Sequence, residues 1–214
     1  MSSPLLLPQI APQIGPVLEA LSIIGTALFA ASGALAAARL QQTLVTFAFF
    51  ALVTGVGGGT LRDLLIGAPV FWVEDPIPAI ACVVAALLVW LTPRDWWSDR
   101  ALDWLDAVGL AAFAVFGAAK ALSFGISPFV AAIMGVVTGC MGGIIRDLLA
   151  GEPSILLRPE IYVTAAALAS GLFVTLAAMG VPVPLASVVA ALAGFALRAI
   201  AIARGLALPS YRGV

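Results

Sequence analysis

Two arginine–aspartate pairs, Arg62-Asp63 and Arg146-Asp147, interrupt stretches of this sequence that are otherwise apolar. An unpaired charge at the centre of a membrane-spanning helix costs about 2.5–3.5 kcal/mol on insertion scales, so such residues mark ion or substrate pathways. Each pair follows a glycine-rich segment, at residues 57–59 and at 142–143. Glycine weakens a helix, and a broken helix frees carbonyl groups that can coordinate a cation. These residue types predict passage of an ion or a small solute rather than bond-making chemistry.

Both pairs belong to a duplicated motif. The sixteen residues 54–69 recur 84 positions later as residues 138–153, and ten of the sixteen positions are identical. Composition bias repeats alanine and leucine by accident, but it does not repeat two glycines followed by arginine and aspartate. Three further matches at this offset precede the motif: Gly25, Phe29 and Gly33 correspond to Gly109, Phe113 and Gly117. The chain is therefore an internal duplication.

The composition indicates lipid as the solvent. Of the 214 residues, 63% are hydrophobic and 10% are charged, against about 25% charged in an ordinary soluble domain. Histidine is absent, which removes the commonest general base and metal ligand. No nucleophile–base set or group of metal ligands is visible, so an enzyme is disfavoured. Cys82 and Cys140 lie in apolar runs, and we expect both to be small buried side chains.

Seven apolar stretches are long enough to cross about 30 Å of hydrocarbon at 1.5 Å per residue. We expect these helices near residues 17–38, 43–66, 76–92, 104–122, 127–150, 160–179 and 183–203. The expected divisions are an N-terminal tail (1–16), repeat 1 (17–93), a cytoplasmic linker (94–103), repeat 2 (104–180), a seventh helix (181–204) and a C-terminal tail (205–214). The fold class is all-α, with seven transmembrane helices.

Three spans in each repeat force the two repeats into opposite orientations, so we expect an inverted repeat. The distribution of arginine and lysine then sets the orientation. With the N-terminus outside, the outer side holds Arg62 and Lys120. The inner side collects the other eight: Arg39, Arg94, Arg100, Arg146, Arg158, Arg198, Arg204 and Arg212. We therefore expect a multi-pass protein of a bacterial or archaeal cell membrane, with an outer N-terminus and a cytoplasmic C-terminus.

The second and fifth spans are expected to break at their glycines. Gly57, Gly58 and Gly59 lie near the middle of one span, and Gly142 and Gly143 occupy the matching place in the other. Thr60 and Asp63 have the spacing of a capping box that would restart the helix, whereas Ile144 replaces the threonine in the second copy. Met141 replaces Gly57 in that copy, so its half of the pathway is expected to be narrower. The alternative is close packing of helices through small residues.

The buried charges are expected to pair between the repeats, Arg62 with Asp147 and Arg146 with Asp63, because neighbours on a helix point about 100° apart. Such pairs would either clamp the two repeats together or line the ion path. Lys120 is the only lysine, and its counterpart in repeat 1 is Ala36. It either extends to the outer interface or reaches the cavity and repels cations. Three hydroxyl residues could line the path or satisfy local carbonyls: Ser32, Thr54 and Thr138.

Two copies of a GGG-T-x-R-D-x-L-x-G-x-P type motif, seven spans and the segment 117–122 resemble the prokaryotic trimeric intracellular cation channels. These are relatives of the potassium-permeable counter-ion channels of animal endoplasmic and sarcoplasmic reticulum. The resemblance extends from about residue 17 to residue 203. It implies a homotrimer with an ion pathway inside each protomer, shaped by the glycines of both motifs. It also implies that the four motif charges are the buried polar partners of that pathway.

The expected function is passive conduction of monovalent cations, potassium among them, through each protomer. No carboxylate ring or Thr-Val-Gly-Tyr-Gly filter is visible, so modest selectivity is expected. The alternative is a secondary transporter of a small solute such as glycine, because the same prokaryotic domain has been described as a glycine transporter family and inverted repeats suit rocking. No cofactor is expected beyond the permeant K⁺, and no metal beyond a transient monovalent cation. The expected partners are other copies of the chain and membrane lipid, with no nucleic acid.

Overall fold

The computed structural model describes residues 15–98 and 100–209, and helices occupy all seven expected stretches. The expected N-terminal tail, except for its last two residues, and Arg212 lie outside the described residues. The helices are α2 (Pro16–Arg39), α3 (Leu44–Ile66), α4 (Phe71–Glu74), α5 (Ile77–Leu91), α6 (Ala101–Ser123), α7 (Pro128–Ala150), α8 (Val163–Ala178) and α9 (Val183–Arg204). Two 3₁₀ turns, Arg94–Trp96 and Ile155–Leu157, complete the regular structure of these residues.

Within these described ranges, five helices are long and apolar enough to cross a membrane: α2, α3, α6, α7 and α9. Two further apolar helices are shorter than these five, since α5 has 15 residues and α8 has 16. At 1.5 Å per residue they reach roughly 23 Å, which is less than the hydrocarbon thickness. The chain is an all-helical membrane protein, and complete crossing by α5 and α8 remains a prediction.

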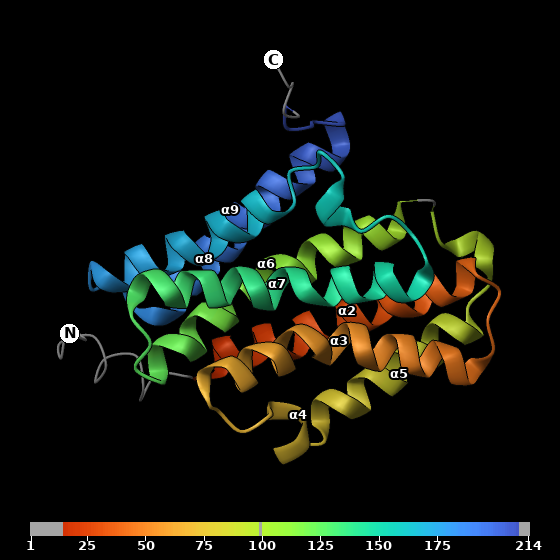
Figure 1. Ribbon diagram of the computed structural model, residues 1–214, viewed down its shortest axis with the longest axis horizontal. Coiled ribbons are helices and arrows are strands. Elements are labelled where there is room, and N and C mark those ends of the chain that lie inside the picture. Colours follow the sequence, from red (N-terminus) through yellow and green to blue (C-terminus); the bar gives the residue numbers. More distant parts are fainter. Residues whose placement is uncertain (1–14, 99, 210–214) are drawn as a thin grey trace.

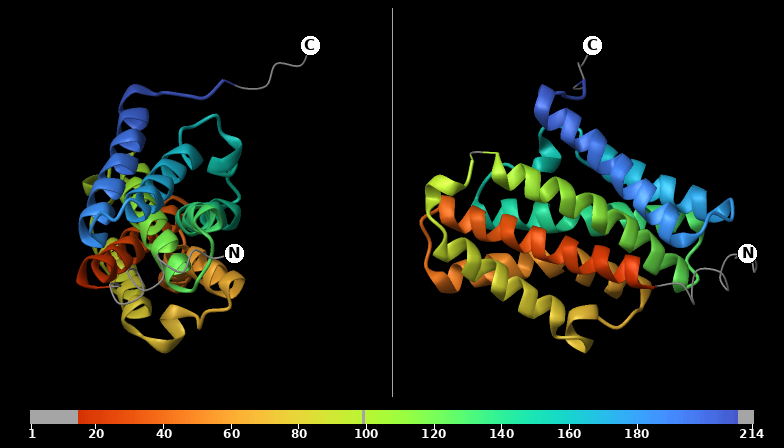
Figure 2. Two further views of the ribbon diagram at one scale, coloured as in Figure 1. Left: turned by 90° about the vertical axis from the view of Figure 1, so that its left-hand side faces the viewer. Right: turned by 180° about the vertical axis from the view of Figure 1, so that it is seen from behind.

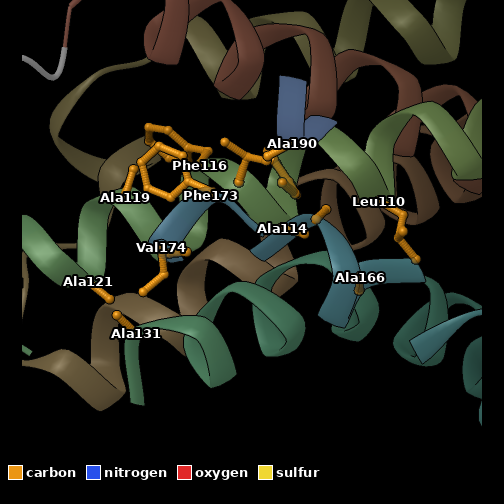
Figure 3. Packing of buried hydrophobic residues seen from close by; sticks show 14 of the residues in the cluster. Leu110, Ala114, Phe116, Ala119, Ala121, Ala131, Ala166, Phe173, Val174 and Ala190 are labelled. Carbon is orange, nitrogen blue, oxygen red and sulfur yellow. The ribbon is translucent and has the colours of Figure 1, made fainter. Parts of the chain in front are cut away.

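Helix α6 forms the centre of the structure. Figures 1 and 2 show α4 and α5 at one edge and the inclined pair α8 and α9 at the opposite edge. In the apolar core of the second half, Leu110, Ala114 and Phe116 of α6 gather with Phe173 of α8 and Ala190 of α9 (Figure 3). A second cluster of buried residues joins α2, α3 and α5. The two cysteines are free and buried, as expected.

The two repeats contact each other reciprocally. A Cβ atom at Gly25 would lie 2.5 Å from the ring of Phe113, and one at Gly109 would lie 3.0 Å from the ring of Phe29. The contacting residue numbers rise along α2 as they fall along α6, so these equivalent helices run antiparallel. Helices α3 and α7 also run antiparallel. Gly58 of α3 packs on the Thr138 carbonyl of α7, and Gly142 of α7 packs on the Thr54 carbonyl of α3. This antiparallel, reciprocal relation is what an inverted repeat requires.

The predicted helix breaks are wrong. Helix α3 continues through residues 57–59, and α7 continues through residues 142–143. Three glycines weaken a helix by roughly 1 kcal/mol each relative to alanine, but every backbone group left unsatisfied in hydrocarbon costs several kcal/mol. The intact helix is therefore the cheaper state, and Gly57, Gly58 and Gly142 serve the alternative role of close packing between α3 and α7.

Both motif helices end in the same way. The C-terminal residues Gly67 and Gly151 adopt φ = +69°. The next residue donates its N–H to the carbonyl of the motif aspartate in each copy, from Ala68 to Asp63 at 2.8 Å and from residue 152 to residue 147 at 3.0 Å. This left-handed cap favours glycine because a Cβ atom is strained there.

Replacing Gly67 with alanine is expected to lower the free energy of unfolding by about 1 kcal/mol. Its surroundings are open, because a Cβ atom there would meet nothing within 4 Å in the described part of the chain, so the penalty is backbone strain alone. The measurement is the unfolding midpoint of the purified protein in detergent. Gly67→Asn is the matched control, since asparagine tolerates this conformation, and equal losses for both variants would contradict the assignment.

Candidate functional site: two buried charge clusters

The first charge cluster consists of Arg62, Asp63 and Lys120 with the rings of Phe71 and Phe116. Asp63 Oδ1 accepts a hydrogen bond from Arg62 Nε at 2.9 Å and lies 2.9 Å from Lys120 Nζ. The Arg62 guanidinium stands 5.0 Å from the centroid of the Phe116 ring and 5.8 Å from that of Phe71. Arg62 and Asp63 are fully buried and Lys120 is partly exposed, so this cluster sets two cations beside one buried anion.

The Lys120 side chain is 14% exposed and turns inward to Asp63 instead of extending to the interface. Of the two positions expected for the Lys120 side chain, at the outer interface or in the interior, this contact shows the interior one. The contact also explains why α6 carries a single cation near the end of its apolar run, because the buried aspartate supplies a counter-charge there.

Thr60 does not cap a helix start, which corrects the predicted capping box. Its hydroxyl donates to the Val56 carbonyl one turn earlier at 2.8 Å and accepts from Trp72 Nε1 at 2.9 Å. The second oxygen of Asp63 accepts from the backbone N–H of Phe71 at 3.0 Å. These bonds fasten the short helix α4 beside the cluster. Thr60 and Asp63 thus position a loop rather than a half-helix.

The second charge cluster consists of Arg146, Asp147, Asp106 and Ser32. Asp147 Oδ1 accepts from Arg146 Nε at 3.0 Å and from Nη2 at 2.8 Å. Arg146 Nη1 donates to Asp106 Oδ1 at 2.6 Å and to Ser32 Oγ at 3.1 Å. One cation therefore bridges two carboxylates, the reverse of the balance in the first cluster.

Asp147 repeats the loop contact of Asp63. Its second oxygen accepts from the backbone N–H of Ile155 at 2.8 Å, eight residues further on, as Phe71 N–H does for Asp63. The two donors differ by the repeat offset of 84. The duplication thus extends from sequence to hydrogen bonding at both motif ends.

The predicted pairing between repeats is wrong, because each arginine binds the aspartate that follows it. The backbone directions of neighbouring residues do diverge, but the guanidinium group stands several bonds from its Cα and folds back onto the adjacent carboxylate. The polar contacts between the repeats are made by other pairs of residues. Lys120 of repeat 2 binds Asp63 of repeat 1, and Arg146 of repeat 2 binds Ser32 of repeat 1.

Gly57, Gly58 and Gly142 line the contact between the two motif helices, together with the backbone carbonyls of Thr54 and Thr138. Thr138 Oγ1 donates to the Met134 carbonyl at 2.6 Å, which satisfies a local acceptor. Thr54 Oγ1 is buried and has no hydrogen-bond partner within the described ranges. A Cβ atom at Gly57 would lie 3.0 Å from Ile145 Cδ1, and one at Gly59 would lie 2.6 Å from the Phe71 ring. Gly143 faces the second cluster, where its Cβ atom would lie 3.0 Å from Asp106 Oδ1.

A cavity of about 150 Å³ reaches the second cluster from the molecular surface. Arg146 and Asp147 form part of its wall. Its remaining walls come from the end of α2, the start of α6 and the segment after α7: Ala36, Arg39, Leu40, Leu102, Asp103, Ala150, Glu152, Ile155 and Arg158. The cavity connects this buried charge cluster to the surface, and its walls carry charged residues of both signs.

Sequence reasoning missed a polar extension of the second cluster. Arg198 of α9 is 2% exposed and donates to Glu160 Oε2 at 2.7 Å. Its guanidinium stands 5.3 Å from the centroid of the buried Tyr162 ring. Asp106 and Arg198 both fall inside predicted apolar spans, and that placement was the signal that could have identified them.

Comparison with known proteins gives consistent relatives. A family model described as "Glycine transporter" matches residues 19–94 and 103–178. A "UPF0126 membrane protein" of Vibrio cholerae is 41% identical over 201 residues, which cover 91% of this chain and 83% of that protein. The "UPF0126 inner membrane protein YadS" of Escherichia coli is 40% identical over 197 residues, with 89% and 94% covered. The crystal structure of the trimeric intracellular cation (TRIC) channel orthologue from Rhodobacter sphaeroides is 45% identical, with a TM-score of 0.82 over 89% of this chain and 99% of that one.

Proposed function

Because this chain belongs to the trimeric intracellular cation channel family, we propose that it conducts potassium and other monovalent cations passively across a membrane. The observation that carries the proposal is the pair of buried charge clusters of opposite sign within one chain. Charges at such depth are retained where ions pass. Their enclosure by helices of a single chain favours a pathway inside each protomer.

The proposed assembly is a homotrimer in a bacterial or archaeal cell membrane. Solved relatives are trimeric channels, and the Escherichia coli relative is named as an inner membrane protein. The proposed orientation puts the N-terminus outside and the C-terminus in the cytoplasm. Arg100 Nη1 donates to the Ile202 carbonyl at 3.3 Å, so the start of α6 and the end of α9 share one end of the bundle. Arg204 lies at that end, which agrees with the positive-inside rule.

The second candidate is a secondary transporter of a small solute such as glycine. It is favoured by the description of the matching family model and by the antiparallel relation of the repeats. A carrier of this kind must move one repeat against the other, whereas a channel conducts with the repeats held together. That difference makes the two functions separable.

The test uses the purified protein in planar bilayers, with one repeat cross-linked to the other. Gly57→Cys and Ile145→Cys place thiols on facing sides of α3 and α7, where a short bifunctional thiol reagent can join them. The wild type, whose Cys82 and Cys140 are buried, and each variant with only one of the two introduced cysteines are treated with the same reagent as controls. Unitary potassium currents that persist after cross-linking support the channel. Saturable glycine flux without unitary currents, abolished by cross-linking, would establish the carrier instead.

Replacing Lys120 with methionine should raise potassium conductance by about threefold or more, because it removes one of the two cations beside Asp63. Arg62 remains to neutralise the aspartate. Single-channel currents in symmetrical potassium chloride measure the effect. Lys120→Arg keeps the charge and should behave as the wild type. Equal conductance in all three proteins would show that Lys120 is a structural clamp.

A further inference from the structure

A cavity of about 350 Å³ lies between the ends of α2 and α5, the start of α3 and the linker that leads to α6. Its volume falls within the range of about 300–1,000 Å³ that is typical of ligand pockets. The apolar and aromatic part of its lining comes from Leu35, Ala38, Phe47, Val89, Trp90 and Trp97. The polar part comes from Arg39, Gln41, Gln42, Thr92 and Ser98. We call this space the aromatic cavity.

The aromatic walls of this cavity are fixed by their neighbours. The rings of Phe47 and Trp90 meet edge to face, with their centroids 4.9 Å apart. Trp97 Nε1 donates to Thr92 Oγ1 at 2.9 Å, and that hydroxyl donates to the Val89 carbonyl at 3.0 Å. A ligand that enters such a pocket loses little free energy to the ordering of side chains. The aromatic cavity is therefore pre-organised.

Arg39 is the only charged residue that the described part of the chain contributes to this lining. It lies in the last turn of α2 and is exposed. A guanidinium group forms charge-assisted, often bidentate, hydrogen bonds with phosphate and carboxylate groups. Gln41, Gln42 and Ser98 add side chains with neutral hydrogen-bond donors to the same walls. The polar part of the aromatic cavity therefore complements an anion.

The surface beside the cavity favours a lipid over a soluble anion. Val83, Leu87 and Trp90 of α5 are 46%, 40% and 44% exposed, and their spacing puts them on one face of the helix. This apolar stripe ends at Trp90, which lines the cavity. Indole side chains favour the headgroup layer of a membrane. An acyl chain can lie along the stripe while its phosphate group reaches Arg39.

We propose that the aromatic cavity binds an anionic phospholipid such as phosphatidylglycerol, with Arg39 as the ionic partner of its phosphate group. Arg39 also lines the cavity of about 150 Å³ beside the start of α6, so both cavities lie at the same end of the bundle. The proposed orientation puts this end in the cytoplasm. Basic pockets between helices on that side of a membrane bind anionic headgroups.

The binding test counts lipids on the purified full-length protein by native mass spectrometry, during titration with phosphatidylglycerol or with phosphatidylcholine of the same chain length. The wild type should prefer phosphatidylglycerol by about fivefold or more, the effect of one arginine beside an anionic lipid. Arg39→Gln should lose this preference. Arg204→Gln, exposed at the same end but outside the cavity lining, is the matched control and should keep it. No preference in the wild type, or an unchanged one in Arg39→Gln, would overturn the proposal.

Thiol labelling locates the bound lipid. Gln42→Cys places a thiol on the wall of the aromatic cavity, and the native Cys82 and Cys140 are buried. Phosphatidylglycerol at twice its dissociation constant should slow labelling by a water-soluble maleimide by about threefold. Glu152→Cys, in the wall of the other cavity, should be labelled at an unchanged rate. Protection of Gln42→Cys without lipid would show that another copy of the chain fills the cavity, and protection by inorganic phosphate alone would show a soluble-anion site.

The position of Arg39 between the two cavities has a consequence for conduction that rests on the proposed channel. A bound phosphate neutralises a positive charge in the wall of the cavity that reaches the second charge cluster, which favours the entry of cations. Potassium conductance is compared between phosphatidylglycerol and phosphatidylcholine bilayers. The ratio should be about twofold larger in the wild type and in Arg204→Gln than in Arg39→Gln, whose remaining ratio reports the general surface charge of the membrane. Equal ratios in all three proteins would overturn this link. If the wild type gave no current, the proposed channel would fail, while the lipid counts still decided the site.

Discussion

Replacing Arg146 with methionine should lower the free energy of unfolding by about 3–5 kcal/mol, the cost of leaving buried charge uncompensated. The substitution strands Asp106 and Asp147, which are 1% and 7% exposed, without their shared cation. Methionine fills a similar volume, so the loss is electrostatic rather than a packing defect. The measurement is reversible unfolding of the purified protein in mixed detergent micelles.

Two further variants separate the charge effect from a general loss of arginine. The double variant Arg146→Met with Asp106→Asn should recover part of the stability, because it removes one of the stranded carboxylates. Arg158→Met is the matched control, since the Arg158 side chain is 42% exposed and lies 3.9 Å from Glu160. Equal stability of the Arg146→Met and Arg158→Met proteins would show that the second cluster contributes nothing to folding.

A second large effect is expected for Gly58→Val. A Cβ atom at Gly58 would overlap the carbonyl oxygen of Thr138, which belongs to the backbone of α7 and cannot rotate away. Helices α3 and α7 must therefore separate, and we expect a loss of about 3 kcal/mol in the free energy of unfolding. Gly142→Val should behave alike, since its Cβ atom would lie 2.5 Å from the Thr54 carbonyl oxygen.

The matched control is Gly171→Ala, in the middle of α8. A Cβ atom at Gly171 would meet no heavy atom within 4 Å in the described residues, so alanine should stabilise the helix by about 1 kcal/mol. A lower free energy of unfolding for Gly58→Val together with a higher one for Gly171→Ala would show that the close helix contact lies at the motif. A stabilising effect of Gly58→Val would contradict the close contact between α3 and α7.

The sequence sufficed to predict where the long helices lie, because apolar composition marks them, whereas complete crossing by α5 and α8 stays a prediction. The offset of 84 and the odd number of spans predicted two units of opposite direction, and the reciprocal contacts of Gly25 and Gly109 agree with that. The breaks at the glycines were predicted wrongly, because the same residues can either interrupt a helix or admit a neighbour. The choice depends on whether another backbone lies alongside, which a single sequence does not reveal.

The site was predicted less completely than the fold. The motif charges were identified because they interrupt apolar runs, and they are buried as expected. Their partners were assigned wrongly, because the reach of a guanidinium group was judged from its Cα direction alone. Asp106 and Arg198 could not be found from the duplication, because neither residue belongs to the motif that is present in both copies. Residues that break the symmetry are found only by asking which charges have no counterpart.

Each repeat carries both halves of the surface by which it packs on the other, since Gly58 meets Thr138 as Gly142 meets Thr54. Two separate copies of such a three-helix unit, inserted in opposite directions, would bury the same surfaces as a homodimer. Gene fusion fixes the direction of each half and releases the halves from having to be identical. A fused chain can then place lysine at position 120 and aspartate at position 106 in one half only, and so obtain a polarity that a homodimer of identical units cannot have.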